Sequence, residues 1–292
     1  MTDIKTEHMT VEGRCLCGGA RYRVEGERSG IIVCHCQRCR KHMGAAYVSF
    51  PVFESGEFTW LSGRESLKVY PTVHGEDGRS FCGVCGTSMP GPSRGGKTLG
   101  GVLAGHIVDM PPADLVFHVY TASKCPWVTI PDDALQWDIV PPHFRDPDLP
   151  ELDRSTEPGK ITGSCLCGDV SFEATDPIIM MNCNCSRCRL SRGAAHATNL
   201  FVSADDFCWR TGEQHVVNYK LPDAERFGAA FCQRCGSLMP REAGSDGKRI
   251  NIPVGCLDSD PGISPSGHIF VGSKAPWFEI TDDLPQRDES WR

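Results

Sequence analysis

The chain has 292 residues, which is about two domains at roughly 150 residues each. Its 40% hydrophobic and 23% charged residues are typical of a soluble globular protein, and no window approaches the ~20 continuous apolar residues of a membrane helix. A net charge of -7 disfavours nucleic acid as a partner, because that binding depends on Lys and Arg neutralising phosphates. The polar first ten residues predict no secretory signal and a cytoplasmic location, with neither nucleic acid nor membrane as partner.

The first recognisable segments hold five cysteines. A Gly-x-Cys-x-Cys-Gly segment at 13–18 precedes a strand-like run at 20–24. A Cys-x-Cys-x-x-Cys-Arg segment follows at 34–40, and the residues after Cys36 are the one short helix that we expect. A second strand-like run follows at 46–50.

The later segments add two more cysteines, at the Cys-x-x-Cys-Gly spacing of a zinc knuckle, and a histidine. A Phe-Cys-x-x-Cys-Gly segment stands at 81–86, and His118 precedes a Ser-Lys-x-Pro-Trp segment at 123–127. Short strands punctuated by glycine and proline, without long helical periodicity, predict a mostly β fold.

These segments return 149 or 150 residues later, at 163–168, 183–189, 231–236, His268 and 273–277. Two copies kept in register over that length indicate a gene duplication, in which each copy is a whole domain. The proline-rich stretch between them cannot hold the interior of a helix or strand. We therefore expect an N-terminal tail at 1–12, a first domain at 13–140, a linker at 141–161 and a second domain at 162–288.

Seventeen cysteines without a secretory signal favour metal binding over disulfides. Two distant pairs in each copy offer the four thiolates that a closed, structural zinc site requires. These predicted ligands are Cys15, Cys17, Cys82 and Cys85, and in the second copy Cys165, Cys167, Cys232 and Cys235.

The remaining three cysteines of each copy leave a fourth tetrahedral position open, as in catalytic zinc sites. They are Cys34, Cys36 and Cys39, and Cys183, Cys185 and Cys188. Nearby arginines at 38, 40, 187 and 189 can offset their negative charge. Three alternatives stay open: disulfides, which would leave one of seven cysteines unpaired; an iron–sulfur cluster, which lacks an obvious fourth thiolate; and a structural zinc with a fourth protein ligand.

Three cysteines have no cysteine counterpart in the other copy, and we expect Cys125, Cys208 and Cys256 to be buried thiols. Other positions also differ between the copies: His35 matches Asn184, Tyr47 matches His196, and His106 matches Cys256. If these residues line the open zinc positions, the two sites differ in specificity.

His118 and His268 are the only histidines paired between the copies. Each is a candidate general acid or base beside an open zinc, because histidine titrates near physiological pH. The competing interpretation is a core histidine satisfied by hydrogen bonds.

The ordered cysteine segments resemble the glutathione-dependent formaldehyde-activating enzyme family, which includes the centromere protein V type domains. The resemblance covers both copies. It implies two tandem Mss4-like zinc-binding β domains with two zincs each, four per chain, in which the four-cysteine sets are structural and the three-cysteine sets exchangeable. It also implies a carbon–sulfur lyase or synthase that acts on a glutathione or other thiol adduct.

Two other functions are weighed against the enzyme. A non-catalytic zinc-stabilised binding or scaffold module of the centromere protein V type would use all zincs structurally, and a redox sensor would need exposed cysteines of low pKa. We further expect the copies to pack as an internal pseudo-dimer, which would leave the chain a monomer.

Overall fold

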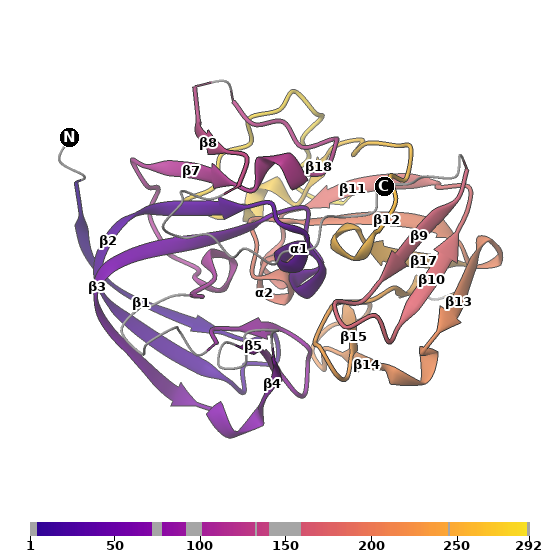
Figure 1. Ribbon diagram of the computed structural model, residues 1–292, viewed down its shortest axis with the longest axis horizontal. Coiled ribbons are helices and arrows are strands. Elements are labelled where there is room, and N and C mark those ends of the chain that lie inside the picture. The colour runs from indigo at the N-terminus through magenta and orange to yellow at the C-terminus, as the bar shows by residue number, and fades with distance from the viewer. Residues whose placement is uncertain are drawn as a thin grey trace.

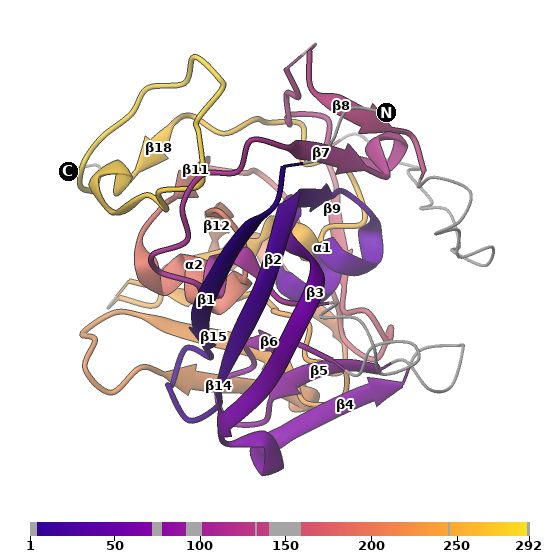
Figure 2. The same ribbon diagram turned by 90° about the vertical axis from the view of Figure 1, so that its left-hand side faces the viewer.

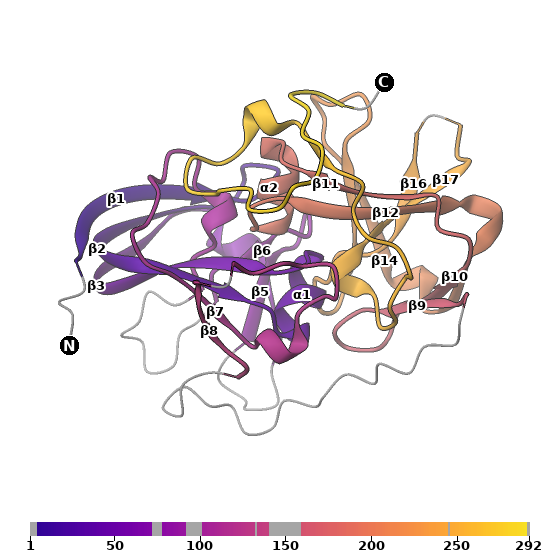
Figure 3. The same cartoon turned by 90° about the horizontal axis from the view of Figure 1, so that it is seen from above.

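The computed structural model describes residues 5–71, 78–91, 101–131, 133–139, 159–244 and 246–290. Within these ranges two β-rich copies lie side by side, and the two short helices lie between them (Figures 1 and 3). The predicted linker falls almost entirely on 140–158, outside the described residues. The fold is mostly β, as the sequence predicts.

The first copy is built around one long strand, β2, with β3 along one edge and β1 and then β7 along the other (Figure 2). Its strands are β1 (Glu7–Arg14), β2 (Arg21–Cys34), β3 (Val48–Ser62), β7 (Val116–Val119) and β8 (Leu135–Trp137), with β4 (Leu67–Pro71), β5 (Gly78–Cys82) and β6 (Ser88–Met89) in a smaller sheet. Buried and exposed residues alternate along β1. The segment 7–12, expected as part of a tail, therefore belongs to the sheet.

The second copy repeats this order with more and shorter strands. They are β9 (Ile161–Ser164), β10 (Ser171–Ala174), β11 (Ile179–Cys183), β12 (Ala197–Ser203), β13 (Phe207–Thr211), β14 (Val216–Lys220), β15 (Gly228–Cys232), β16 (Arg241–Ala243), β17 (Arg249–Pro253) and β18 (His268–Ile269). They form a five-stranded sheet in the order β16-β17-β12-β11-β18, a three-stranded sheet β13-β10-β9, and the pair β14-β15.

The long strand of the first copy is split in the second for a local reason. Asp176, between β10 and β11, has a φ of 46°, and Pro177 follows it. Proline lacks the backbone N–H that a continuous ladder requires, and a left-handed residue turns the chain out of the strand. The second copy therefore divides into two sheets at this point.

The two helices, α1 (Gln37–Met43) and α2 (Ser186–Arg192), lie where the sequence predicts. Each ends at a glycine in the left-handed region, Gly44 with a φ of 65° and Gly193 with a φ of 60°. Glycine is favoured there because it has no Cβ to clash with the backbone.

The ends of these helices fit against the other copy. A Cβ on Gly105, in the 3-10 turn η3 (Ala104–His106), would lie 2.3 Å from the nitrogen of Ala194. A Cβ on Gly255, in the equivalent turn η8 (Val254–Cys256), would lie 2.1 Å from the carbonyl oxygen of Arg40. The packing is reciprocal, as expected of an internal pseudo-dimer, and it depends on the absence of side chains.

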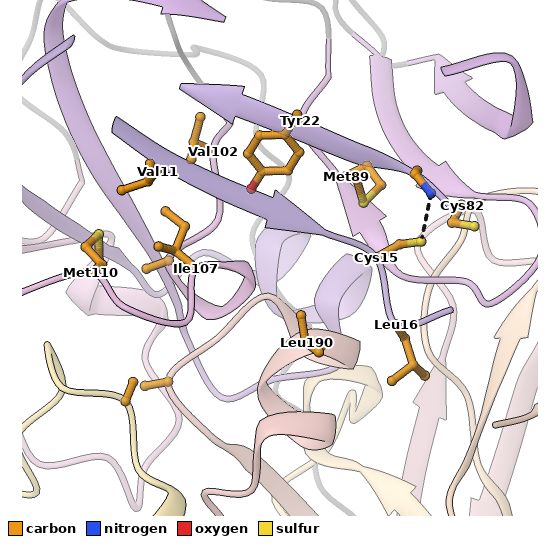
Figure 4. Close-up of a cluster of buried hydrophobic side chains, with 14 of the residues drawn as sticks. Val11, Cys15, Leu16, Tyr22, Cys82, Met89, Val102, Ile107, Met110 and Leu190 are labelled. Carbon is orange, nitrogen blue, oxygen red and sulfur yellow. Dashed lines mark hydrogen bonds between the residues drawn. The ribbon is translucent and has the colours of Figure 1, made fainter. Parts of the chain in front are cut away.

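The apolar cores also cross the boundary between the copies. Leu190 of α2 belongs to the cluster that contains Tyr22 and Met89 of the first copy (Figure 4). Phe81 and Phe231 meet with ring centroids 6.2 Å apart. The copies therefore share hydrophobic core.

No helix in the described part of the chain is long and apolar enough to cross a membrane.

Candidate metal centres

Two sets of four cysteines converge, one in each copy. The members are Cys15, Cys17, Cys82 and Cys85, and Cys165, Cys167, Cys232 and Cys235. In each set the four sulfurs lie within 4.8 Å of one another. The structure thus brings together the distant pairs that the spacing predicts.

The sulfur spacing fits a tetrahedral metal. The Sγ atoms of Cys15 and Cys17 lie 3.3 Å apart and those of Cys17 and Cys82 lie 3.8 Å apart. The equivalent distances in the second copy are 3.4 and 3.8 Å. Four sulfurs at ~2.3 Å from one zinc stand roughly 3.8 Å apart, so each set can hold such an ion with little adjustment.

Backbone and hydroxyl groups support both four-cysteine sets in the same way. The N–H of Ala20 donates to the sulfur of Cys15 at 3.3 Å, and the N–H of Val170 does so to Cys165 at 3.3 Å. The hydroxyl of Thr87 accepts from the N–H of Leu16 at 3.1 Å. It also lies 3.3 Å from the sulfur of Cys85, and so ties one cysteine pair to the other. Ser237 makes the equivalent contacts in the second copy.

The three-cysteine sets form around the first turn of each helix. Cys36 and Cys185 cap α1 and α2, and each sulfur accepts a hydrogen bond at 3.4 Å from the N–H of the third cysteine. The three sulfurs of each set lie within 4.8 Å of one another. In the described residues no fourth Cys, His, Asp or Glu completes either set, which is consistent with an open coordination position.

Thiol–thiol hydrogen bonds lower the pKa of the third cysteine in the first set and of the second cysteine in the second set. Bonds from Cys34 and Cys36 lower the pKa of Cys39. In the second copy, bonds from Cys183 and Cys188 lower the pKa of Cys185 to about 3.

The two three-cysteine sites also differ in access. All three cysteines of the first set are buried, whereas Cys185 and Cys188 are partly exposed. In the first copy the guanidinium of Arg79 donates to the sulfur of Cys39 at 3.6 Å. Although burial alone would lower it, the charges of Cys39 and Cys36 raise the pKa of Arg79. The second copy has Ala229 at the position of Arg79.

A cavity opens beside the second site. It has a volume of about 200 Å³, and Cys183, Cys188, Arg192 and Arg241 are in its wall. A larger groove of about 680 Å³ shares residues 227–229 and Arg241 with it. The cavity beside the thiols of the second site therefore adjoins this groove.

Two arginines next to the cysteine turns, Arg40 and Arg189, donate hydrogen bonds to groups outside the three-cysteine sets. Burial lowers the pKa of Arg189, and the charge of Cys185 acts in the opposite direction. Arg40 is buried and donates to the carbonyl of His35 at 3.2 Å and to the sulfur of Cys125 at 3.1 Å. Arg189 is buried and donates to the carbonyl of Ser273. Sequence reasoning missed Arg79, Arg192 and Arg241, although each breaks the repeat, opposite Ala229, Met43 and Gly91.

The paired histidines sit in different surroundings. His118 lies 2.9 Å from His35, nitrogen to nitrogen, and burial lowers its pKa. His268 is 1% exposed, and its Nε2 lies 3.1 Å from a carboxylate oxygen of Asp282. Neither histidine is in the wall of the cavity at the second site. The general acid or base role of the two histidines stays a prediction.

A polar chain crosses between the copies at equivalent positions. The hydroxyl of Tyr47 lies 2.9 Å from Nε2 of His196, whose other ring nitrogen lies 3.4 Å from the hydroxyl of Thr198. Tyr47 and His196 occupy matching places in the repeat. These residues join the copies to each other and do not contact the cysteine sulfurs in any of these bonds.

The remaining cysteine predictions have mixed outcomes. None of the seventeen cysteines forms a disulfide, so the disulfide alternative is wrong. Cys125 and Cys256 are buried as expected. Cys208 is exposed, against expectation, because it lies on β13 at the edge of its sheet with its side chain outward.

Fold and cysteine clusters together define a tandem β protein with four thiolate centres that could hold metal ions. A model of the family "Glutathione-dependent formaldehyde-activating enzyme" matches the chain twice, at residues 10–123 and 160–273. The chain belongs to this family, as the sequence resemblance indicates.

Two individual proteins are similar to parts of the chain. A Halomonas elongata protein named "Putative glutathione-dependent formaldehyde-activating enzyme" is 31% identical over an alignment of 134 residues that covers 41% of this chain and 80% of that protein. A crystal structure of a Rhodobacter sphaeroides protein is 24% identical over 36% of this chain and 91% of its own, with a TM-score of 0.27.

Proposed function

We propose that the protein is a zinc-dependent carbon–sulfur lyase or synthase that acts on a glutathione or other thiol adduct of the formaldehyde type. The observation that carries this proposal is the three-cysteine turn with no fourth donor among the described residues, present in both copies. Family membership and the name of the Halomonas elongata relative support it.

The donor chemistry favours zinc over other ions. Thiolates are soft ligands, and four sulfurs in a tetrahedral cage are typical of zinc or an iron–sulfur centre. The Cys-x-x-Cys-Gly knuckles have the spacing of zinc sites. We propose two zincs per copy and four per chain, held by the fourteen cysteines of the four sets.

The reaction needs a thiol sulfur held as an anion beside a carbonyl carbon. A zinc held by the three cysteines would offer its open fourth coordination position to that sulfur and favour its deprotonated form. In the synthetic direction the sulfur lone pair forms the new carbon–sulfur bond, the C=O π pair moves to oxygen, and that oxygen takes the proton that the thiol lost. In the reverse direction the carbon–sulfur bond breaks and the sulfur regains the proton.

The chain's own residues prepare this site. The capped first helical turn fixes the positions of Cys183, Cys185 and Cys188, so that little rearrangement is needed when substrate arrives. The cavity of about 200 Å³ next to Cys183 and Cys188 gives a confined space for the reacting groups. His118 and His268 remain proposed proton carriers.

Metal content and adduct formation test the proposal together. Elemental analysis of protein purified without chelator should give close to four zincs per chain, and glutathione with formaldehyde should give S-hydroxymethyl adduct faster than without protein. Two zincs per chain and no acceleration would contradict the proposal. Light scattering is expected to show a monomer, since the copies already bury their facing surfaces against each other.

A further inference from the structure

The walls of the two three-cysteine sites have diverged in a consistent direction. The second site has Arg192, Asn199, Arg241 and Asn251 where the first copy has Met43, Phe50, Gly91 and Gly101. It has Ala229 where the first has Arg79. The second copy has thus gained polar groups around its thiols and lost the arginine that contacts a thiol in the first.

The polar groups of the second site have unused hydrogen-bonding capacity. Arg192 is only 8% exposed, and its Nη2 donates to the side-chain oxygen of Asn199 at 3.1 Å. Its Nη1 and the side-chain oxygen of Asn251 are buried without a partner. An unpaired buried polar atom costs about 1–3 kcal/mol, and both residues also stand in the wall of the cavity.

The charges at this site also point to a bound ligand. Within the described ranges neither Arg192 nor Arg241 forms an ion pair with a carboxylate. Burial lowers the pKa of both. The guanidinium of Arg241 donates to the carbonyl of Glu242 at 2.9 Å. Two arginines that flank one cavity match the two oxygens of a carboxylate, which accepts paired N–H donors.

We infer that only the second three-cysteine site takes substrate, and that it selects a thiol that also carries a carboxylate, read by Arg241 and Arg192. This deepens the proposed function and rests on it. The thiol lies at the end of the cavity formed by Cys183 and Cys188, and the carboxylate lies toward Arg241, which the inner cavity shares with the outer groove. The first site is closed by Arg79, whose guanidinium already occupies the space beside Cys39.

Calorimetry on the full, zinc-loaded chain separates these statements. The probes are 3-mercaptopropionate, with a thiol and a carboxylate, and 2-mercaptoethanol, which lacks the carboxylate. We expect one equivalent of 3-mercaptopropionate per chain and at least about tenfold weaker binding of 2-mercaptoethanol, since one charged hydrogen bond contributes that much. Two equivalents, or equal affinity for both probes, would overturn the inference.

Three variants locate the binding. Arg241→Gln should weaken 3-mercaptopropionate at least about tenfold and leave 2-mercaptoethanol unchanged. Ala229→Arg, which copies the first site, should abolish binding of both probes. Arg234→Gln is the matched control, because Arg234 is exposed and pairs with Asp169 away from the cavity. If Arg241→Gln binds 3-mercaptopropionate like the unchanged chain, the carboxylate assignment is wrong.

Failure of the proposed function has a different signature. Because calorimetry needs no turnover, carboxylate-dependent binding without adduct formation would contradict the lyase and leave the binding assignment standing. Adduct formation at an unchanged rate in the Arg241→Gln variant would support the lyase and contradict the carboxylate assignment. Arg192→Met, which restores the residue of the first copy, serves as a second variant, and circular dichroism confirms that each variant is folded.

Discussion

The two three-cysteine turns have the same local structure but different surroundings. In both, a cysteine caps a seven-residue helix, and its sulfur accepts a hydrogen bond from the backbone N–H of the third cysteine. The first turn is fully buried with an arginine on one sulfur, whereas the second is partly exposed beside a polar cavity. The same ligand motif can therefore serve a closed site and an open one, since surrounding residues control access.

The largest expected effect separates the two turns by activity. Cys185→Ser should lower the rate of thiol-adduct formation at least about a hundredfold, because it removes a ligand from the open site. Cys36→Ser, its counterpart, should retain most of the rate per folded molecule. The measurement is adduct formed per zinc-loaded chain, and equal losses in the two variants would show that the sites work alike.

The next effect tests the reciprocal packing of the copies. Gly105→Ala and Gly255→Ala should each lower the free energy of unfolding by about 1–3 kcal/mol, because the new Cβ meets backbone of the other copy. Gly272→Ala is the control, since its Cβ would have no neighbour closer than 3.8 Å. Urea unfolding measures all three, and a stable Gly255→Ala chain would mean that the copies can separate without loss.

A smaller effect concerns the hydrogen bond between Tyr47 and His196, which occupy equivalent positions in the two copies. Tyr47→Phe removes the hydroxyl that lies 2.9 Å from Nε2 of His196, and should cost about 1–2 kcal/mol by leaving a buried ring nitrogen unpaired. Combining it with His196→Phe in a double-mutant cycle isolates the pair. Additive costs would show that the contact contributes nothing of its own.

The last effect is the pH dependence of stability that one buried histidine, His106, contributes. Burial lowers the pKa of His106 from 6.5 to about 3, while Cys256 stands at the matching position. Above pH 6.5 the ring is neutral in both states. Below it only the unfolded chain gains the proton, so the free energy of unfolding falls by up to about 1.4 kcal/mol per pH unit.

His106→Cys should therefore flatten the fall in stability between pH 6.5 and 5 relative to the unchanged chain. Cysteine protonation at the metal centres is common to both proteins, so the difference between the two slopes reports His106. Parallel slopes would mean that the folded protein protonates this histidine as easily as the unfolded one.

Much of the fold and of the metal centres was predictable because it depends on short segments. The Cys-x-Cys-x-x-Cys turn, the short helix after it and the Cys-x-x-Cys-Gly knuckle are local, and a duplicated order shows which segments belong together. The split of the long strand at Asp176 was also a local event, but it is visible only in one copy, and the repeat conceals it.

The sequence alone determined the duplication, the mostly β class and the fourteen cysteines that form the four clusters, because ligand spacing and repeat register are written along the chain. Only the tertiary structure decided that Arg79, Arg192 and Arg241 surround the three-cysteine sites. Arg79 lies 40 residues from Cys39 in the chain and meets it only when β5 packs beside α1. Side chains brought together by sheet packing leave no local pattern, so the difference between the two sites became visible only in three dimensions.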